Sequence, residues 1–289
     1  MAALPKLVTP APSDLAEYFA VHGQFPRLSD ERKPWTYKGW LLMYVIEIHR
    51  LHPEVPDRWG YWFRTREAGR LLAEPIPKIA FGGTADHKVQ SDIQSWLDIL
   101  DGHYGGWSSF GRLLEWLAFG LAVDDTDPKL NPEISEKLYR ALNVGPMLLA
   151  PYDHLGSFLE TNRGKGKFWN SNAFYATPHN VVEFMVQMQL ADSKPEDLLT
   201  AKVCDPCLGT GRMLLHASNY CLRLFGADID RTVLMIARIN GALYAPWMSF
   251  PLPEEYFVPA DREKRIIQLL HDRDQVDHEL RRVHQGLEL

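Results

Sequence analysis

Two carboxylates flank a glycine-rich turn, and they form the clearest chemical pattern in the chain. Asp205 ends a short apolar run and is followed by the turn at residues 206–211, which contains Gly209 and Gly211. Asp228 ends the next apolar run. Glycine lets the backbone adopt positive φ and leaves room for a ligand to lie against it. Because an acid in front of the turn disfavours a bound pyrophosphate, the pattern favours a ligand that carries an ammonium and a sulfonium group.

A dinucleotide site is the alternative for a glycine-rich turn of this kind. Its fingerprint, G-x-G-x-x-G, requires glycine where this chain has Leu214. Asp228 can instead accept hydrogen bonds from both hydroxyls of a ribose. Together the two acids and the turn predict a pocket for a nucleoside joined to an amino acid, which fits S-adenosylmethionine.

A β-α-β unit must position these residues. The sequence predicts a short strand at residues 202–205, a helix that opens at Arg212, and a second strand at residues 224–230 with Asp228 at its carboxyl end. Ligands of open α/β sheets bind at the carboxyl ends of the strands. The order of elements therefore predicts a partial Rossmann-like core, and the apolar period of residues 231–244 predicts a helix packed on it.

Segments around this unit resemble blocks of the amino-group (adenine) DNA methyltransferases, in particular the modification subunits of type I restriction systems. Residues 205–211 are similar to the D-P-A-C-G-T-G cofactor motif, residues 172–178 to the F-Y-x-T-P segment before it, and residues 226–230 with 237–240 to the next block. Order and spacing match over roughly residues 164–244. The resemblance implies S-adenosylmethionine as cofactor, DNA as partner and a role in restriction-modification.

The resemblance also implies roles for the site residues. Asp205 would hold the methionine ammonium and Asp228 the ribose, while Ile229 would press on the adenine. Tyr175 and Thr177 would close the carboxylate end of the cofactor. An ordinary helix cap is the alternative for Thr177 and the proline after it. The expected cofactor residues are Tyr175, Thr177, Pro178, Asp205, Pro206, Gly209, Thr210, Gly211, Asp228 and Ile229.

The chain departs from the family at the catalytic motif. The family's tetrapeptide, Asn or Asp followed by Pro-Pro and an aromatic residue, accepts hydrogen bonds from the target amino group and stacks on the flipped base. The 289 residues contain no Pro-Pro pair, and the string Asn131-Pro132-Glu133-Ile134 lacks both the second proline and the aromatic residue. We therefore expect no catalytic residue in this chain, and we expect another chain to supply the catalytic loop.

Three functions are compatible with these features. The first is an S-adenosylmethionine-binding part of a DNA adenine methyltransferase, which meets DNA through a partner subunit. The second is a catalytically inactive, methyltransferase-like module that binds other proteins. The third is a methyltransferase for a different substrate, which needs a catalytic group that the sequence does not identify.

Composition limits the setting of the protein. A net charge of −6 and a pI near 6.0 argue against a protein that coats nucleic acid on its own. Three cysteines and the absence of a secretory signal in residues 1–13 predict a reducing cytoplasm. No apolar run is long enough to span a bilayer. Cys204 and Cys207 form a C-x-x-C pair, but a zinc site needs two further ligands at suitable spacing.

The rest of the chain predicts two domains. Residues 1–160 are predicted to form an all-helical N-terminal domain. The polar segment 161–167 is predicted to be the boundary. Residues 161–289 are predicted to form a truncated Rossmann-like methyltransferase domain. A C-terminal helix at 261–287 predicts a coiled-coil-like seam for a protein partner or homodimer, or a helix that lies on the domain. Further predicted elements are helices at 13–21, 35–49, 89–100, 107–123, 132–142 and 177–190, a loop at 75–86 and a short strand at 256–258.

Two features allow more than one interpretation. Residues 59–66 are rich in aromatic residues and arginines, which predicts either a nucleic-acid contact or the core of the helical domain. The strand at 202–205 has predicted neighbours on one side only, so its other edge would be unpaired. We expect the C-terminal helix, the N-terminal helices or a partner subunit to cover that edge.

Overall fold

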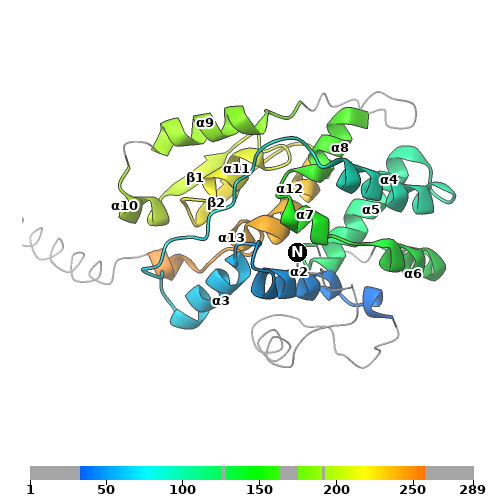
Figure 1. Ribbon diagram of the computed structural model, residues 1–289, viewed down its shortest axis with the longest axis horizontal. Coiled ribbons are helices and arrows are strands. Elements are labelled where there is room, and N and C mark those ends of the chain that lie inside the picture. Colours follow the sequence, from blue (N-terminus) through cyan, green and yellow to red (C-terminus); the bar gives the residue numbers. More distant parts are fainter. Residues whose placement is uncertain (1–32, 125–127, 163–174, 191–192, 258–289) are drawn as a thin grey trace, which may run out of the picture.

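The computed structural model describes four stretches of the chain, and these contain helices around one two-stranded sheet (Figure 1). The predicted helices at 13–21 and 261–287 lie outside the described residues, and so does most of the predicted boundary at 161–167. The described stretches are residues 33–124, 128–162, 175–190 and 193–257.

Helices make up the described part of the chain before residue 163, as the periodicity predicts. The helices predicted at 89–100, 107–123 and 132–142 are confirmed, with ends that differ by three residues or fewer. Asp86 and Asn131 cap two of them, because each side chain accepts a hydrogen bond from a first-turn N–H group. The elements are η2 (Pro34–Thr36), α2 (Trp40–Leu51), α3 (Arg58–Ala68), α4 (His87–Asp101), α5 (Gly106–Gly120), α6 (Pro132–Ala141), α7 (Gly145–Leu149) and α8 (His154–Asn162).

The described residues after 174 form the α/β part. Strand β1 pairs in parallel with β2, with Lys202 opposite Arg223 and Asp205 opposite Gly226. The short strand predicted at 256–258 is wrong at residues 256 and 257, which belong to a 3-10 helix, while residue 258 lies outside the described residues. The elements are α9 (His179–Leu190), α10 (Pro195–Thr200), β1 (Lys202–Asp205), α11 (Arg212–Ala217), β2 (Arg223–Gly226), α12 (Arg231–Tyr244), α13 (Pro246–Ser249) and η3 (Glu254–Phe257).

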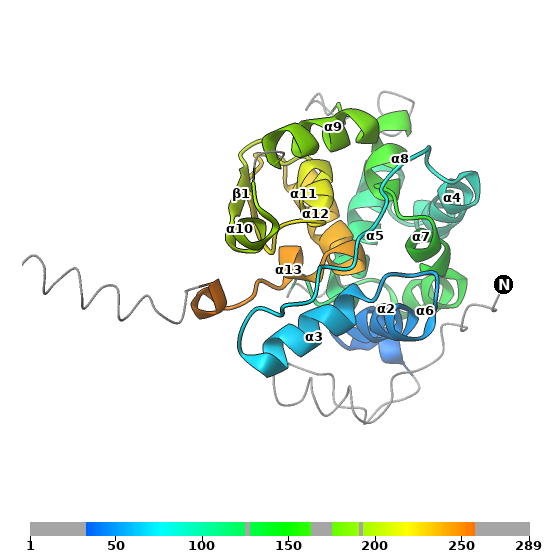
Figure 2. The same cartoon turned by 60° about the vertical axis from the view of Figure 1, so that its left-hand side comes forward.

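One hydrophobic core joins the two parts. Helix α12 contacts α5 and α8 as well as α11 and α13 (Figure 2). His49 Nε2 on α2 lies 2.9 Å from Leu243 O, and Trp59 Nε1 on α3 donates to Ala242 O at 3.0 Å. The carbonyl groups at the end of α12 are therefore bound by side chains of the first helices. The division into two domains at residue 160, like the Rossmann-like core, stays a prediction.

The aromatic rings of α3 are buried. Tyr61 packs against Trp247 with ring centroids 6.0 Å apart, and Trp59 packs against Phe250 at 5.5 Å. Arg64 forms ion pairs with neighbouring acids. Because these rings fill the core, they are not available to stack on bases, and the structure supports the core interpretation of residues 59–66.

Strand β1 has one neighbouring strand within the described residues. On one face of the sheet, Cys204 and its register partner Phe225 are both exposed. A parallel sheet is normally covered on both faces.

The edge of β1 that is not paired with β2 is a separate surface. What covers this edge stays a prediction, because one of the three expected covers, the helix at 261–287, lies outside the described residues.

Candidate cofactor site

Backbone hydrogen bonds join the turn between β1 and α11 to the segment after β2. Ala227 N donates to Asp205 O at 3.0 Å, and Leu208 N donates to Ala227 O at 2.9 Å. Gly209 and Gly211 have φ of 54° and 87°, in the left-handed region that favours glycine. The turn thus has the backbone conformation that its two glycines predict.

Five of the expected cofactor residues line one small cavity of about 70 Å³ beside this turn. They come from two separate segments, the residues ahead of α9 and the turn itself. Asp205 Oδ1 accepts a hydrogen bond from Cys207 N at 3.0 Å, while its other oxygen accepts none within the described residues. The lining residues are Tyr175, Ala176, Thr177, Val182, Asp205, Cys207, Leu208, Gly209, Thr210, Arg212 and Met213.

Asp228 lies two residues beyond β2 and lines a different cavity, of about 310 Å³. Its Oδ2 accepts a hydrogen bond from Gly209 N at 2.8 Å. The buried side chain of Leu208 lines both cavities and packs on Gly226, where an added Cβ would lie 2.7 Å from Leu208 Cδ1. The two acids are thus joined through the backbone of the turn but line separate cavities, whereas the sequence predicts one pocket for both.

Four expected residues lie outside the linings of these cavities, namely Pro178, Pro206, Gly211 and Ile229. Pro178 O accepts hydrogen bonds from the N–H groups of Val181 and Val182, so Pro178, and not the threonine before it, directly precedes the first residue of α9, His179. Pro206 is exposed on the turn. Ile229 follows Asp228 and is 97% exposed. An apolar side chain with this exposure is available to a ligand or a partner.

Thr210 and Gly211 face the interior of the protein. The Thr210 hydroxyl donates to Asp153, a residue of the segment before α8. At Gly211 an added Cβ would lie 2.6 Å from Met248 Cε. These two positions hold the turn against α8, α12 and α13, and their contact with the cofactor stays a prediction.

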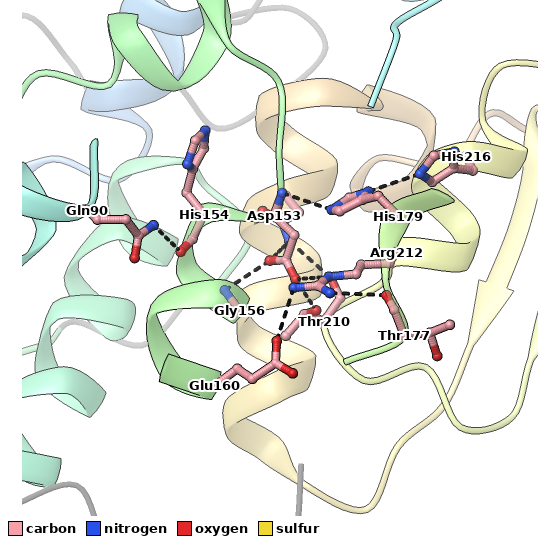
Figure 3. Close-up of polar contacts among 11 residues, drawn as sticks. Gln90, Asp153, His154, Gly156, Glu160, Thr177, His179, Thr210, Arg212 and His216 are labelled. Carbon is pink, nitrogen blue, oxygen red and sulfur yellow. Dashed lines mark hydrogen bonds and ion pairs between the residues drawn. The ribbon is translucent and has the colours of Figure 1, made fainter. Parts of the chain in front are cut away.

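A buried carboxylate outside the predicted motifs joins the elements of this region (Figure 3). Asp153 is fully buried. Its Oδ2 accepts hydrogen bonds from the Thr210 hydroxyl and from Arg212 Nε, the latter at 2.8 Å. Its Oδ1 accepts from Gly156 N and from Asn240 Nδ2, both at 2.9 Å. One side chain therefore joins α8, the turn, α11 and α12.

Arg212 is also buried, at the first position of α11. Besides the bond to Asp153, its Nη1 donates to Thr177 O at 3.1 Å. Its Nη2 has no hydrogen-bond partner within the described residues, and Glu160 Oε2 lies 3.8 Å from it. The guanidinium thus fixes the segment ahead of α9 against the turn and retains one unused donor group.

Comparison with known proteins identifies the segment that forms this site. Residues 157–245 match the N-6 DNA methylase family. The match confirms the resemblance to adenine DNA methyltransferases, and it includes the glycine turn and Asp228. No curated protein and no solved structure matches the chain. Among the described residues, no helix has the length and apolar character that crossing a membrane requires.

Two histidines form a second buried pair beside the glycine turn. His179 Nδ1 on α9 and His216 Nε2 on α11 are 3.0 Å apart, so one ring donates to the other. Burial, together with the nearby Arg212 guanidinium, lowers the pKa of both rings to about 4. Both rings are therefore neutral at pH 7, and the pair holds α9 on α11.

Some residues of this network could be predicted from the sequence, and others could not. Arg212 directly follows the glycine motif, so its place in the site follows from the motif's position. Asn240 lies within the last block of the resemblance. Asp153 has no such signal, because it precedes the resembling segment and its neighbours form no motif.

Proposed function

We propose that this protein binds S-adenosylmethionine and works as part of an adenine DNA methyltransferase in a DNA-modification or restriction-modification system. The match of residues 157–245 to N-6 DNA methylases supports the methyltransferase assignment. The observation that carries the proposal is the shared cavity at the glycine turn. There the segment with Tyr175 and Thr177 meets Asp205 and Gly209.

The groups around the turn fit this cofactor. Asp205 has one oxygen without a hydrogen bond from the described residues and lines the small cavity, where it would hold the methionine ammonium. The bare backbone of Gly209 would lie under the methionine. Each oxygen of Asp228 accepts one backbone hydrogen bond and retains a lone pair for the ribose hydroxyls. When bound, S-adenosylmethionine supplies a methyl group on a sulfonium for transfer to an amino group.

The adenine would lie beside Ile229. This side chain is 97% exposed, and it directly follows the acid that would hold the ribose. Burial of an isoleucine side chain against an apolar ring contributes about 1.5–3 kcal/mol. The exposure of Ile229 therefore supports a cofactor that lies over the outer surface of the turn.

A partner polypeptide would supply the catalytic tetrapeptide, and it would also bring the DNA. Exposed apolar side chains of the α/β part support a partner. Helix α9 buries Val182 and Val186, yet its opposite face is also apolar, and a helix that is apolar on both faces is normally covered on both. The large exposed apolar residues between 175 and 229 are Tyr175, Val181, Phe184, Met185, Met188, Phe225 and Ile229.

An inactive methyltransferase-like interaction module is the second candidate. It is favoured because Asp205 and Asp228 line two separate cavities, with Leu208 in the wall of both, and not one pocket. In this case the pocket is vestigial, and the apolar face of α9 binds another protein.

Calorimetric titration with S-adenosylmethionine tests the proposal. We expect saturable binding that weakens at least tenfold in Asp205→Asn, because a hydrogen bond to a charged group contributes about 1.5–3 kcal/mol. Asp86→Asn is the matched control, since asparagine caps α4 as well as aspartate does and the affinity should not change. Absence of binding at millimolar ligand would leave only the inactive module.

A methylation assay tests the role of the partner. Transfer of a labelled methyl group to DNA is measured with this chain alone and with the products of neighbouring genes. Transfer only in the presence of a second product supports a shared active site. Transfer by the chain alone would show that its catalysis is complete and would contradict the need for a partner.

A further inference from the structure

The small cavity at the turn has groups of opposite charge on its wall. Asp205 and Arg212 both line it, and its volume of about 70 Å³ suits a small polar group. An acid alone selects a cation. An acid and a guanidinium at one cavity select a group that carries an ammonium and a carboxylate together, as an α-amino acid does.

The guanidinium of Arg212 has one donor group that the protein does not use. Nε binds Asp153 and Nη1 binds Thr177 O, whereas Nη2 has no hydrogen-bond partner within the described residues. The 3.8 Å distance from Nη2 to Glu160 Oε2 is too long for a hydrogen bond, and the Glu160 side chain is 38% exposed (Figure 3). A buried donor without an acceptor is destabilising, so an unused donor on a residue that lines the cavity indicates an acceptor from outside the described residues.

The orientation of this donor is fixed before any ligand arrives. Asp153 holds Nε at 2.8 Å, and Asp153 is itself fixed by Gly156 N and Asn240 Nδ2. Because the guanidinium is planar, two bonded nitrogens set the direction of the third. A ligand carboxylate that meets Nη2 therefore requires little ordering of the side chain, which favours affinity.

We propose that Arg212 binds the carboxylate of the ligand's amino-acid end and thereby makes the site specific for an intact methionine moiety. The inference rests on the proposed function, since the ligand there is S-adenosylmethionine. It assigns to Arg212 the contact that the sequence analysis gave to Tyr175 and Thr177. Thr177 then has a different role, because its carbonyl orients the guanidinium.

Two ligands that differ only at the carboxylate test the proposal. Decarboxylated S-adenosylmethionine keeps the nucleoside, the sulfonium and the ammonium. We expect the wild-type protein to bind S-adenosylmethionine about tenfold or more tightly than the decarboxylated compound, because the bond to Arg212 is charge-assisted. Calorimetry gives both affinities on the full chain.

Variants of Arg212 then test whether this residue causes the preference for S-adenosylmethionine over the decarboxylated compound. In Arg212→Gln we expect the ratio of the two affinities to fall close to one, mainly through weaker binding of S-adenosylmethionine. Arg212→Lys should retain part of the ratio, because it keeps the charge but not the fork of donors. Arg223→Gln is the matched control, since it removes an arginine of the same α/β part that binds Thr200 O and Glu254 and lines neither cavity.

The outcomes separate the two proposals. A wild-type ratio near one, with both compounds bound, would overturn the role of Arg212 and leave S-adenosylmethionine binding intact. An equal loss of both ligands in Arg212→Gln would show a structural role only, and it would also overturn the proposal. If neither compound binds the wild-type chain, the proposed function fails and the inference fails with it. The wild-type ratio needs no variant, so it decides even if the Arg212 variants do not fold.

Discussion

Replacement of Asp153 by asparagine should lower the free energy of unfolding by far more than the loss of one hydrogen bond would. Oδ2 of Asp153 accepts from Thr210 and Arg212, and Oδ1 accepts from Gly156 N and Asn240. Whichever way the amide is turned, its NH₂ group faces two donors. The variant also leaves the buried Arg212 guanidinium without its closest counter-charge.

The magnitude follows from these contacts. Removing one partner of a buried ion pair costs about 3–5 kcal/mol. Since stabilities of folded domains are typically 5–15 kcal/mol, the loss is a large fraction of the total. It corresponds to a fall in Tm of about 6–20 °C. Urea unfolding followed by tryptophan fluorescence and far-ultraviolet circular dichroism measures the change.

Two comparisons test the reasoning behind this number. Glu160→Gln alters a partly exposed acid 3.8 Å from the same guanidinium, so its cost should stay below about 1 kcal/mol. The double variant Asp153→Asn, Arg212→Met should be more stable than the sum of the single losses predicts, because it removes the unpaired charge. If Asp153→Asn and Glu160→Gln cost the same small amount, the buried network does not stabilise the fold as described.

Three further predictions concern the same core. The pKa of His179 and of His216 is lowered from 6.5 to about 4, so the unfolded chain binds more protons in this interval. Their contribution to stability is therefore complete above about pH 6.5 and is lost as the pH falls towards 4. The urea midpoint should accordingly decrease between pH 6.5 and pH 4, and this decrease should be smaller in His216→Gln. Arg58→Met should lower the free energy of unfolding by about 3 kcal/mol or more, because it leaves several buried acceptors unpaired. A smaller loss would mean that water replaces the guanidinium. Gly211→Ala should lower the free energy of unfolding by about 1–3 kcal/mol, because φ there is 87°, while Gly82→Ala, with open space around it, serves as control.

The sequence predicts the local features of this fold well. The glycines define the turn after β1, because positive φ at Gly209 and Gly211 is a property of the residues themselves. The helices of the first part follow from apolar periodicity and from caps such as Asp86. These signals act over a few residues, so a single sequence contains them.

The features that the sequence does not predict depend on distant contacts. The side chain of Asp153 meets donors 57, 59 and 87 residues further along the chain, and no local pattern marks it. The buried rings of α3 also illustrate this limit. Trp59, Tyr61 and Trp62 lie on more than one face of the helix, and all are buried because α3 packs between other elements, including α2 and α13. Periodicity predicts one buried face and is uninformative for a helix that is covered on several.

The position of Leu208 decides where a cofactor can lie. Its side chain packs on Gly226 and lines the cavity of about 310 Å³, together with other apolar residues and with Asp228 and Arg238. The backbone of Gly209 connects the two acids, because its N–H binds Asp228 while the residue itself lines the cavity of Asp205. A ligand that contacts both carboxylates must therefore cross the outer surface of the turn at Gly209. We propose that the base of that ligand would rest on the exposed Ile229 next to Asp228, and not in the cavity of about 310 Å³.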